Sequence, residues 1–164
     1  MEWKTREAMT RDIPWITEIY NQGIEDRVAT FETDLRTVAV MEDWLSDRGE
    51  RFKVVIIEEE EGIPRGWASI NAFQSRCCYG GVGDLSIYIH RDFRGKGLGK
   101  VLLMNLIETA KEQGFHKLVL SMFDFNEAAK KLYLAQGFRM VGTYKNQGML
   151  DGNYVDVTIM EKLF

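Results

Sequence analysis

The 164-residue sequence predicts an α/β fold with a mixed, mostly antiparallel sheet and helices on both of its faces. The first observation is a strand, a glycine turn and a helix within residues 83–113, where the apolar alternation of Leu85, Ile87 and Ile89 gives way to helical spacing. The second is a β-rich run at Lys117–Met122 after that helix, because a strand that returns through a helix runs parallel to the strand before it. Further strand pairs on both sides of this unit have the spacing of antiparallel hairpins.

The chain before the sheet is predicted to be mostly helical. Thr10 or Asp12 offers an N-cap, and Pro14 is tolerated in a first helical turn. A second helix begins after the N-cap Thr37 and should bury Val38, Met41, Trp44 and Leu45. The expected elements are a strand at Trp3–Ala8, a helix from Pro14 to about Gly23, a loop over residues 24–37 and a helix from Thr37 to about Gly49.

The strands and remaining helices follow from alternation and from turn residues. Asn126 is a predicted N-cap, and Gly114 and Gly137 follow the ends of helices. We expect Gly148 and residues 151–153 to form the turn of a final hairpin. The expected elements are strands at Phe52–Ile57, Trp67–Phe73, Val82–His90 and Lys117–Met122, a helix from Glu127 to Gly137, and hairpin strands at Met140–Tyr144 and Tyr154–Glu161.

Composition limits the class of protein. The length suits one domain over residues 1–164, and 45% hydrophobic with 28% charged residues is ordinary for a globular enzyme. A net charge of −4 gives no reason to expect a nucleic-acid partner, and neither a membrane span nor a signal peptide is expected, so we predict a cytoplasmic location. Adjacent Cys77 and Cys78 do not suit a mutual disulfide, and with only two histidines we expect no metal site.

The glycine turn predicts a phosphate site. Glycine lets the backbone approach a ligand closely, and the free amides in the first turn of a helix favour an anion. The string RGKGLG, from Arg94 to Gly99, matches neither a Walker loop nor a dinucleotide fingerprint.

RGKGLG does resemble the pyrophosphate loop of the GCN5-related N-acetyltransferase (GNAT) superfamily, with Arg94, Gly97 and Gly99 at its three defining positions. A second fingerprint, Asn126 with Ala128, Ala129, Tyr133 and Gly137-Phe138, lies about thirty residues farther on. The resemblance implies an acetyl-CoA-dependent N-acyltransferase in which the parallel strands splay apart to admit the pantetheine arm. The cofactor-binding residues that it implies are Ile87, Tyr88, Ile89, Arg94, Gly95, Lys96, Gly97, Leu98, Gly99, Lys100, Asn126, Lys130 and Tyr133.

Three distant segments narrow the resemblance to the group of phosphinothricin N-acetyltransferases and L-amino acid N-acyltransferases. They are residues 19–33, the pair Arg76 and Tyr79, and the Gly-Asn-aromatic-x-Asp pattern of residues 152–156. This likeness implies a small amino acid or an analogue of the phosphinothricin, methionine sulfoximine or methionine sulfone type as acceptor, and a homodimer. The acceptor-binding candidates are Phe31, Arg76, Tyr79, Lys145 and Tyr154, with Arg76 suited to bind a carboxylate or phosphinate through two hydrogen bonds.

An amine attacks a thioester only as the free base, so the site needs a proton acceptor. We assign this role to Asp84, which stands where the group usually has glutamate; the shorter side chain acts directly or through a bridging water. The resemblance gives Tyr133 the role of acid toward the leaving thiolate, and Asn126 that of positioning the pantetheine arm or a catalytic water. A structural role is the alternative for each residue. Asp84 would then only begin a strand, and Tyr133 would be an aromatic residue of the core.

Two other functions stay open at this point. One is acetylation of a different amine, such as a protein N-terminus, a polyamine or an aminoglycoside. The other is a non-catalytic acyl-CoA-binding module, which would keep Arg94 and the glycines but would not need both Asp84 and Tyr133.

Overall fold

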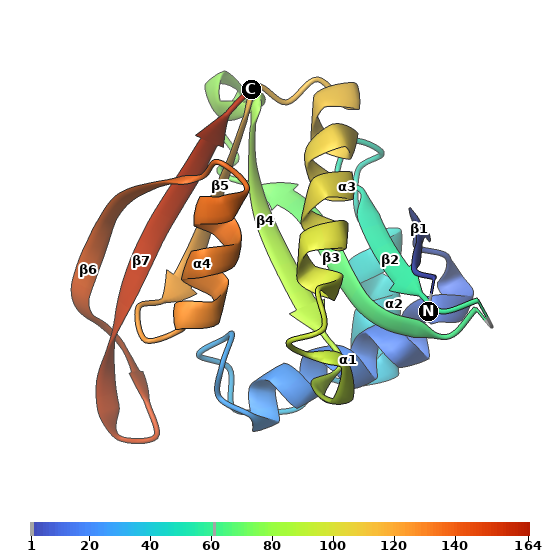
Figure 1. The fold of residues 1–164 in the computed structure, drawn as a ribbon, viewed down its shortest axis with the longest axis horizontal. Coiled ribbons are helices and arrows are strands. Elements are labelled where there is room, and N and C mark those ends of the chain that lie inside the picture. The colour runs from blue at the N-terminus through green and yellow to red at the C-terminus, as the bar shows by residue number, and fades with distance from the viewer. Residues whose placement is uncertain (1, 61) are drawn as a thin grey trace.

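The structure is a computed structural model that describes residues 2–60 and 62–164. These residues form a seven-stranded sheet in the order β1-β2-β3-β4-β5-β7-β6 (Figure 1). Within this described part, β4 and β5 are the one parallel pair, and the other neighbours are antiparallel. The strands are β1 Lys4–Glu7, β2 Val54–Glu58, β3 Pro64–Ala72, β4 Val82–Ile89, β5 Lys117–Phe123, β6 Arg139–Leu150 and β7 Asn153–Leu163.

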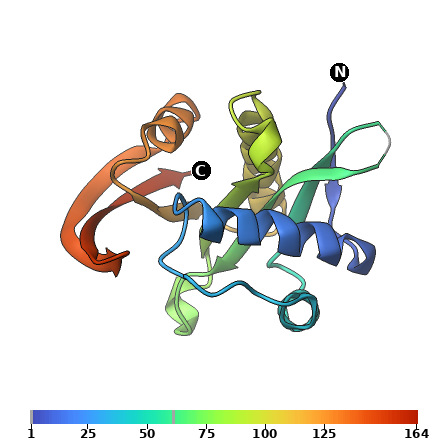
Figure 2. The same ribbon diagram turned by 90° about the horizontal axis from the view of Figure 1, so that it is seen from below.

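Helices cover both faces of the sheet, as predicted (Figure 2). On one face α3 buries Leu98, Leu102 and Leu106 against the central strands. On the other face α1 and α2 form a second core around Trp67, which is fully buried. The helices are α1 Ile13–Glu25, α2 Val38–Ser46, α3 Leu98–Glu112 and α4 Glu127–Ala135, and short 3₁₀ turns lie at η1 Thr10–Asp12, η2 Cys77–Tyr79 and η3 Arg91–Phe93.

The parallel pair is short, and this shapes the site. β4 and β5 pair only from Val82 opposite Lys117 to Asp84 opposite Val119. Beyond those residues the strands diverge, and Figure 1 shows α4 lying beside the opening. Asp84 is therefore the last residue of β4 to pair with β5, at the point where the sheet divides.

The C-terminal hairpin differs from its prediction. The segment from Lys145 to Leu150 is part of β6, so Gly148 is not a turn residue. A register shift between Tyr144 and Gly148 lets the strand continue past residues that have the composition of a turn. Gly148 is needed for close contact instead, since a Cβ there would lie 2.5 Å from the ring of Phe31.

One predicted core position in α2 is also wrong. Val38 is 41% exposed, while Met41 is fully buried and Trp44 and Leu45 pack against the core. Thr37 does cap the helix, and its side chain accepts a hydrogen bond from the amide of Val40. Val38 is the first residue of α2, and Met41, one turn later, is the buried residue of this helix.

Among the described residues, no helix combines the length and the apolar character that a membrane crossing requires.

Candidate active site

A cavity of about 400 Å³ lies between β4, the start of α3 and α4. The glycine turn forms one end, and the other walls are mostly apolar. Of the predicted cofactor residues, those that line it are Ile87, Tyr88, Ile89, Arg94, Gly95, Gly97, Leu98, Gly99, Lys100, Asn126 and Tyr133.

Two predicted cofactor residues do not line this cavity. The ammonium of Lys96 lies 5.1 Å from the centroid of the Phe93 ring. The ammonium of Lys130 pairs with Asp124 and Glu127, each at 3.4 Å. Their assignment to the cofactor stays a prediction.

The turn before α3 has a backbone that requires glycine. Gly95 and Gly97 have φ angles of +73° and +88°, in the left-handed region that side chains disfavour. Gly97 is the N-cap of α3, and the first turn of that helix carries no acidic residue. Its free amides and the positive end of the helix dipole therefore face the cavity without a negatively charged neighbour from the same turn.

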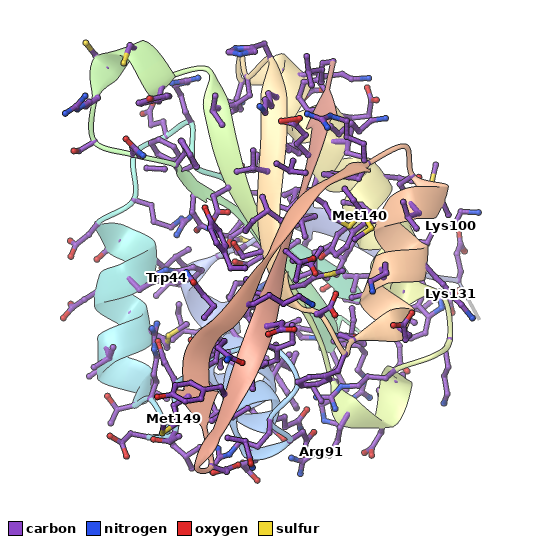
Figure 3. The ribbon with its side chains drawn as sticks, turned by 90° about the vertical axis from the view of Figure 1, so that its left-hand side faces the viewer. Trp44, Arg91, Lys100, Lys131, Met140 and Met149 are labelled. Atoms are coloured by element: carbon purple, nitrogen blue, oxygen red, sulfur yellow. The ribbon has the colours of Figure 1, made fainter. Side chains whose placement is uncertain are left out.

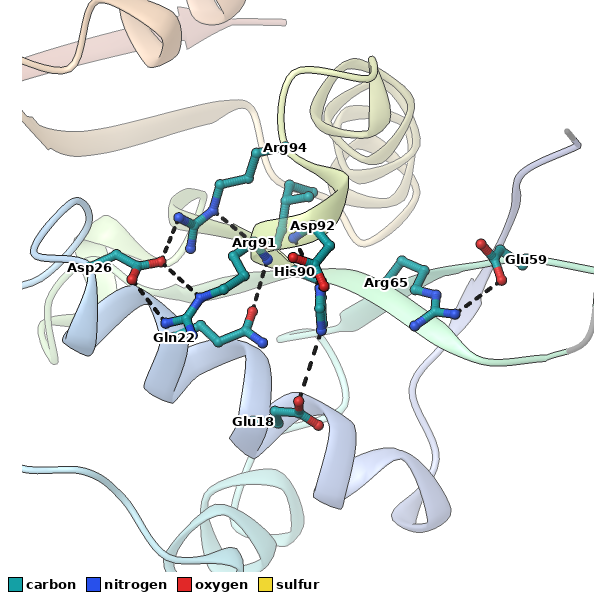
Figure 4. Close-up of polar contacts among 10 residues, drawn as sticks. Glu18, Gln22, Asp26, Glu59, Arg65, His90, Arg91, Asp92 and Arg94 are labelled. Atoms are coloured by element: carbon teal, nitrogen blue, oxygen red, sulfur yellow. Dashed lines mark hydrogen bonds and ion pairs between the residues drawn. The ribbon is translucent and has the colours of Figure 1, made fainter.

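Arg94 stands beside this turn and is held by two groups (Figure 4). Its Nε donates to the carbonyl of Ile89 at 3.2 Å, and its Nη1 lies 2.7 Å from Oδ2 of Asp26. The guanidinium thus lies at the edge of the cavity, bound to a carboxylate at the end of α1.

A second cavity, of about 250 Å³, occupies the division between β4 and β5. It adjoins the first, because both are lined by Tyr88, Asn126 and Tyr133. Asp84 and Tyr133 both line this second cavity. The predicted acid and base are therefore brought together at one place, 49 residues apart in sequence (133 − 84).

Asp84 is placed to accept a proton. Along β4 its side chain alternates with Leu85 and so shares a face with Tyr88, which packs in the core under α1. Burial raises the pKa of Asp84 from 3.8 to about 6. A base with that pKa is mostly ionised at neutral pH and is still basic enough to take a proton during catalysis.

Tyr133 approaches the cavity from α4, on the other face of the sheet. Its side chain belongs to the core under α3 and is only 8% exposed. Burial, followed by the nearby charge of Asp84, raises the pKa of the Tyr133 hydroxyl far above 10. The hydroxyl therefore stays protonated at neutral pH and can donate its proton.

Asn126 is the N-cap of α4, as predicted, and it lines both cavities. Its Oδ1 accepts from the amide of Ala129 at 3.1 Å and caps α4, while its Nδ2 donates to the carbonyl of Val28 at 3.4 Å. Both ends of the amide are occupied within the protein. The side chain thus ties α4, which carries Tyr133, to the loop after α1, and a direct contact with the pantetheine arm stays a prediction.

The predicted acceptor residues are not brought together around Asp84. Arg76 and Tyr79 lie in and beside η2, on the exposed loop before β4, and neither lines the two cavities. In the hairpin, Lys145 is 77% exposed in its side chain and pairs with Asp156 at 3.2 Å, and Tyr154 is also exposed. Phe31 lies nearer, with its ring centroid 4.9 Å from that of Phe123, which lines the second cavity.

Sequence reasoning missed Val28, Ala29 and Asp26. Val28 and Ala29 line both cavities, and Asp26 holds Arg94. Small apolar residues in an irregular loop carry no pattern that would identify them. The Asp26–Arg94 contact joins residues 68 positions apart and could not be found from spacing.

Among the described residues, no group of three or more His, Cys, Asp or Glu side chains is arranged to hold a metal ion.

Comparisons with known proteins agree with this geometry. Residues 16–138 match the model of the Acetyltransferase (GNAT) family. An L-methionine sulfoximine/L-methionine sulfone acetyltransferase of Pseudomonas aeruginosa is 30% identical over 98% of this chain and 94% of its own length. A phosphinothricin acetyltransferase from Sinorhizobium meliloti, solved with acetyl-CoA, superposes with a TM-score of 0.95 at 30% identity, over 100% of this chain and 89% of its own. A structure titled ribosomal-protein-alanine N-acetyltransferase, from Brucella melitensis, gives 0.94 at 32% identity, over 98% of this chain and 99% of its own.

Proposed function

The chain belongs to the acetyltransferase (GNAT) family and is an acetyl-CoA-dependent N-acetyltransferase, and we propose that its acceptor is the amino group of a small amino acid or amino-acid analogue. The proposed analogues are phosphinothricin, methionine sulfoximine and methionine sulfone. The observation that supports the mechanism is that Asp84 and Tyr133 line the same cavity, where β4 and β5 divide.

The residues of the first cavity suit acetyl-CoA. Amides of the turn at Gly97 and Gly99, with Arg94 beside them, form an anion site for the pyrophosphate. The apolar walls follow β4 toward the second cavity. Because β4 does not pair with β5 beyond Asp84, backbone groups on that edge are free to bind the amides of the pantetheine arm and to polarise the thioester carbonyl.

Asp84 and Tyr133 would then divide the proton transfers. Asp84 accepts the proton that the amine loses as its nitrogen bonds to the carbonyl carbon. When the carbon–sulfur bond breaks, Tyr133 donates its proton to the thiolate, so that the products are the amide and CoA. Each such transfer typically contributes ~10²- to 10⁴-fold to the rate, and holding donor and acceptor together contributes by orientation.

The proposed acceptor is supported by relatives named for amino-acid analogues, among them the methionine sulfoximine acetyltransferase of P. aeruginosa. A protein N-terminus is our second candidate, because the B. melitensis structure is named for an alanine of a ribosomal protein and has a similar identity. The geometry of the two cavities does not distinguish between these two kinds of acceptor. We therefore base the choice on what the relatives are named for.

A panel of acceptors tests the proposal. With acetyl-CoA and equal concentrations of each amine, we expect kcat/KM for phosphinothricin, L-methionine sulfoximine and L-methionine sulfone to exceed that for spermidine, kanamycin and a peptide with N-terminal alanine. The expectation rests on the relatives named for these compounds. Buried donors that bind a polar side-chain end lose roughly 1 to 3 kcal/mol when that end is missing, which is large enough to measure. Free thiol gives the rate, and mass spectrometry identifies the acetylated product. A peptide or polyamine acceptor as the best substrate would contradict the proposal.

We also propose a homodimer that covers the outer side of the hairpin. The edge strand β6 exposes apolar side chains, and Figure 3 shows Met140 near one end of it and Met149 near the other. Tyr144 and Tyr154 extend the same hairpin and are 57% and 64% exposed. An exposed apolar edge is typical of a surface that pairs with another chain. Sedimentation at micromolar concentration distinguishes the dimer from a monomer.

A further inference from the structure

We infer that Asp26 competes with the pyrophosphate of acetyl-CoA for the side chain of Arg94, and so weakens the binding of both acetyl-CoA and CoA. The inference rests on the proposed function in one respect, that Arg94 contacts the pyrophosphate. It adds a residue outside the family fingerprints that sets the affinity for the cofactor.

Asp26 contacts two arginines, Arg94 and Arg91 (Figure 4). Oδ2 of Asp26 lies 2.7 Å from Nη1 of Arg94, and Oδ1 lies 2.9 Å from Nη2 of Arg91. Nε of Arg91 also donates to Oδ2, at 3.3 Å. Two guanidinium groups before α3 thus share one carboxylate from a different element.

The position of Asp26 is unfavourable for a carboxylate on local grounds. It is the C-cap of α1, where the negative end of the helix dipole repels an anion. Although burial raises the pKa of Asp26, hydrogen bonds from Arg94 and Arg91 outweigh that effect and lower it. The carboxylate is therefore held at this place by the arginines, and its stabilisation depends on their staying near.

Arg91 and Arg94 differ in their other contacts and in whether they line the cavity. The backbone amide of Arg91 donates to the buried side chain of Gln22 at 2.9 Å, and its guanidinium also contacts Glu25. Arg94, in contrast, lines the cofactor cavity, donates from Nε to the carbonyl of Ile89, and has Asp26 as its one carboxylate partner among the described residues. A pyrophosphate at the start of α3 presents two negative charges to Arg94, and Asp26 is then left near both of them.

A carboxylate that shares a guanidinium with a bound anion repels that anion. Replacing it with the neutral and nearly isosteric amide removes this repulsion and frees Arg94 for the ligand. We expect Asp26→Asn to lower the Kd for acetyl-CoA and for CoA roughly two- to fivefold, the size that one partly exposed charge interaction allows.

The matched control is Glu25→Gln. It removes one negative charge from the adjacent position and loses only a contact with Arg91, so it reproduces the change in net charge without freeing Arg94. S-acetylpantetheine supplies a second control, because it carries the thioester but no pyrophosphate. The KM for S-acetylpantetheine should be the same in Asp26→Asn and in the wild type.

Calorimetry on the intact protein, with circular dichroism to confirm folding, gives the result. Tighter binding of acetyl-CoA by Asp26→Asn, an unchanged Kd in Glu25→Gln and a smaller gain from Asp26→Asn in an Arg94→Gln background support the inference. Weaker binding by Asp26→Asn would show that the carboxylate orients Arg94 for the ligand and would overturn it, as would an equal gain in Glu25→Gln. If the wild type itself binds no acetyl-CoA, the proposed function fails instead.

Discussion

Replacing Asp84 with asparagine is expected to lower kcat/KM about 10²- to 10⁴-fold at pH 7, the usual range for the loss of a general base. The carboxylate has a pKa of about 6 and lines the cavity with Tyr133. In the wild type, kcat/KM should therefore fall as the pH drops through 6, because protonation removes the base. In Asp84→Asn this limb should disappear, and only the ionisation of the acceptor amine should remain in the profile.

The same substitution should not lower the stability of the protein, although it lowers the activity. Its Tm therefore serves as the control. Because the folded pKa of Asp84 is raised, its contribution to stability is full below pH 4 and declines as the pH rises through 6. Asparagine has no such loss, so the Tm of Asp84→Asn at pH 7 should equal or exceed that of the wild type. Asp84→Glu should retain activity. An unchanged pH profile in the asparagine variant would move the role of base to another group.

Introducing glutamate at Gly99 is expected to abolish acetyl-CoA binding, with at least a hundredfold rise in Kd. Gly99 is the second residue of α3, and a Cβ there would lie 3.2 Å from a methyl of Leu132 on α4. The new side chain would fill the approach to the amides and put a negative charge where the pyrophosphate binds. An acidic residue in a first helical turn favours the helix itself, so the fold should survive.

Val40→Glu is the matched control for this variant. It adds the same charge on α2, where Val40 is exposed and lines neither cavity. Calorimetry should then give the wild-type Kd for Val40→Glu and no detectable binding for Gly99→Glu. Normal affinity in a folded Gly99→Glu protein would remove the glycine turn from the cofactor site.

Local patterns were enough to predict the centre of the fold. The turn from Gly95 to Gly97 requires positive φ angles, and the strands on either side of α3 have to be parallel because a helix joins them. Both features depend on neighbouring residues alone. For this reason the place of Asp84 near the start of the strand that leads into the glycine turn could also be predicted.

Contacts between distant segments were not predictable in the same way. The interactions of Asn126 with Val28 and of Arg94 with Asp26 depend on how the loop after α1 lies against α4 and the glycine turn. The continuation of β6 through Gly148 depends on a register shift that the sequence does not mark. Arg76 is assigned to the acceptor site through family likeness, but it lies on a loop that lines neither cavity. Nothing in the sequence indicates that this loop lies outside the cavities.

A crystal structure with a bisubstrate analogue would test the roles of Asp84 as base and Tyr133 as acid. In this compound the sulfur of CoA is joined through the acetyl group to the nitrogen of the amino acid. We expect the nitrogen to lie within hydrogen-bond reach of the Asp84 carboxylate, at about 2.6 to 3.2 Å or through one water. We expect the sulfur beside the Tyr133 hydroxyl, with both atoms in the cavity where β4 and β5 divide. A nitrogen on a wall away from Asp84, or a sulfur out of reach of Tyr133, would contradict these roles.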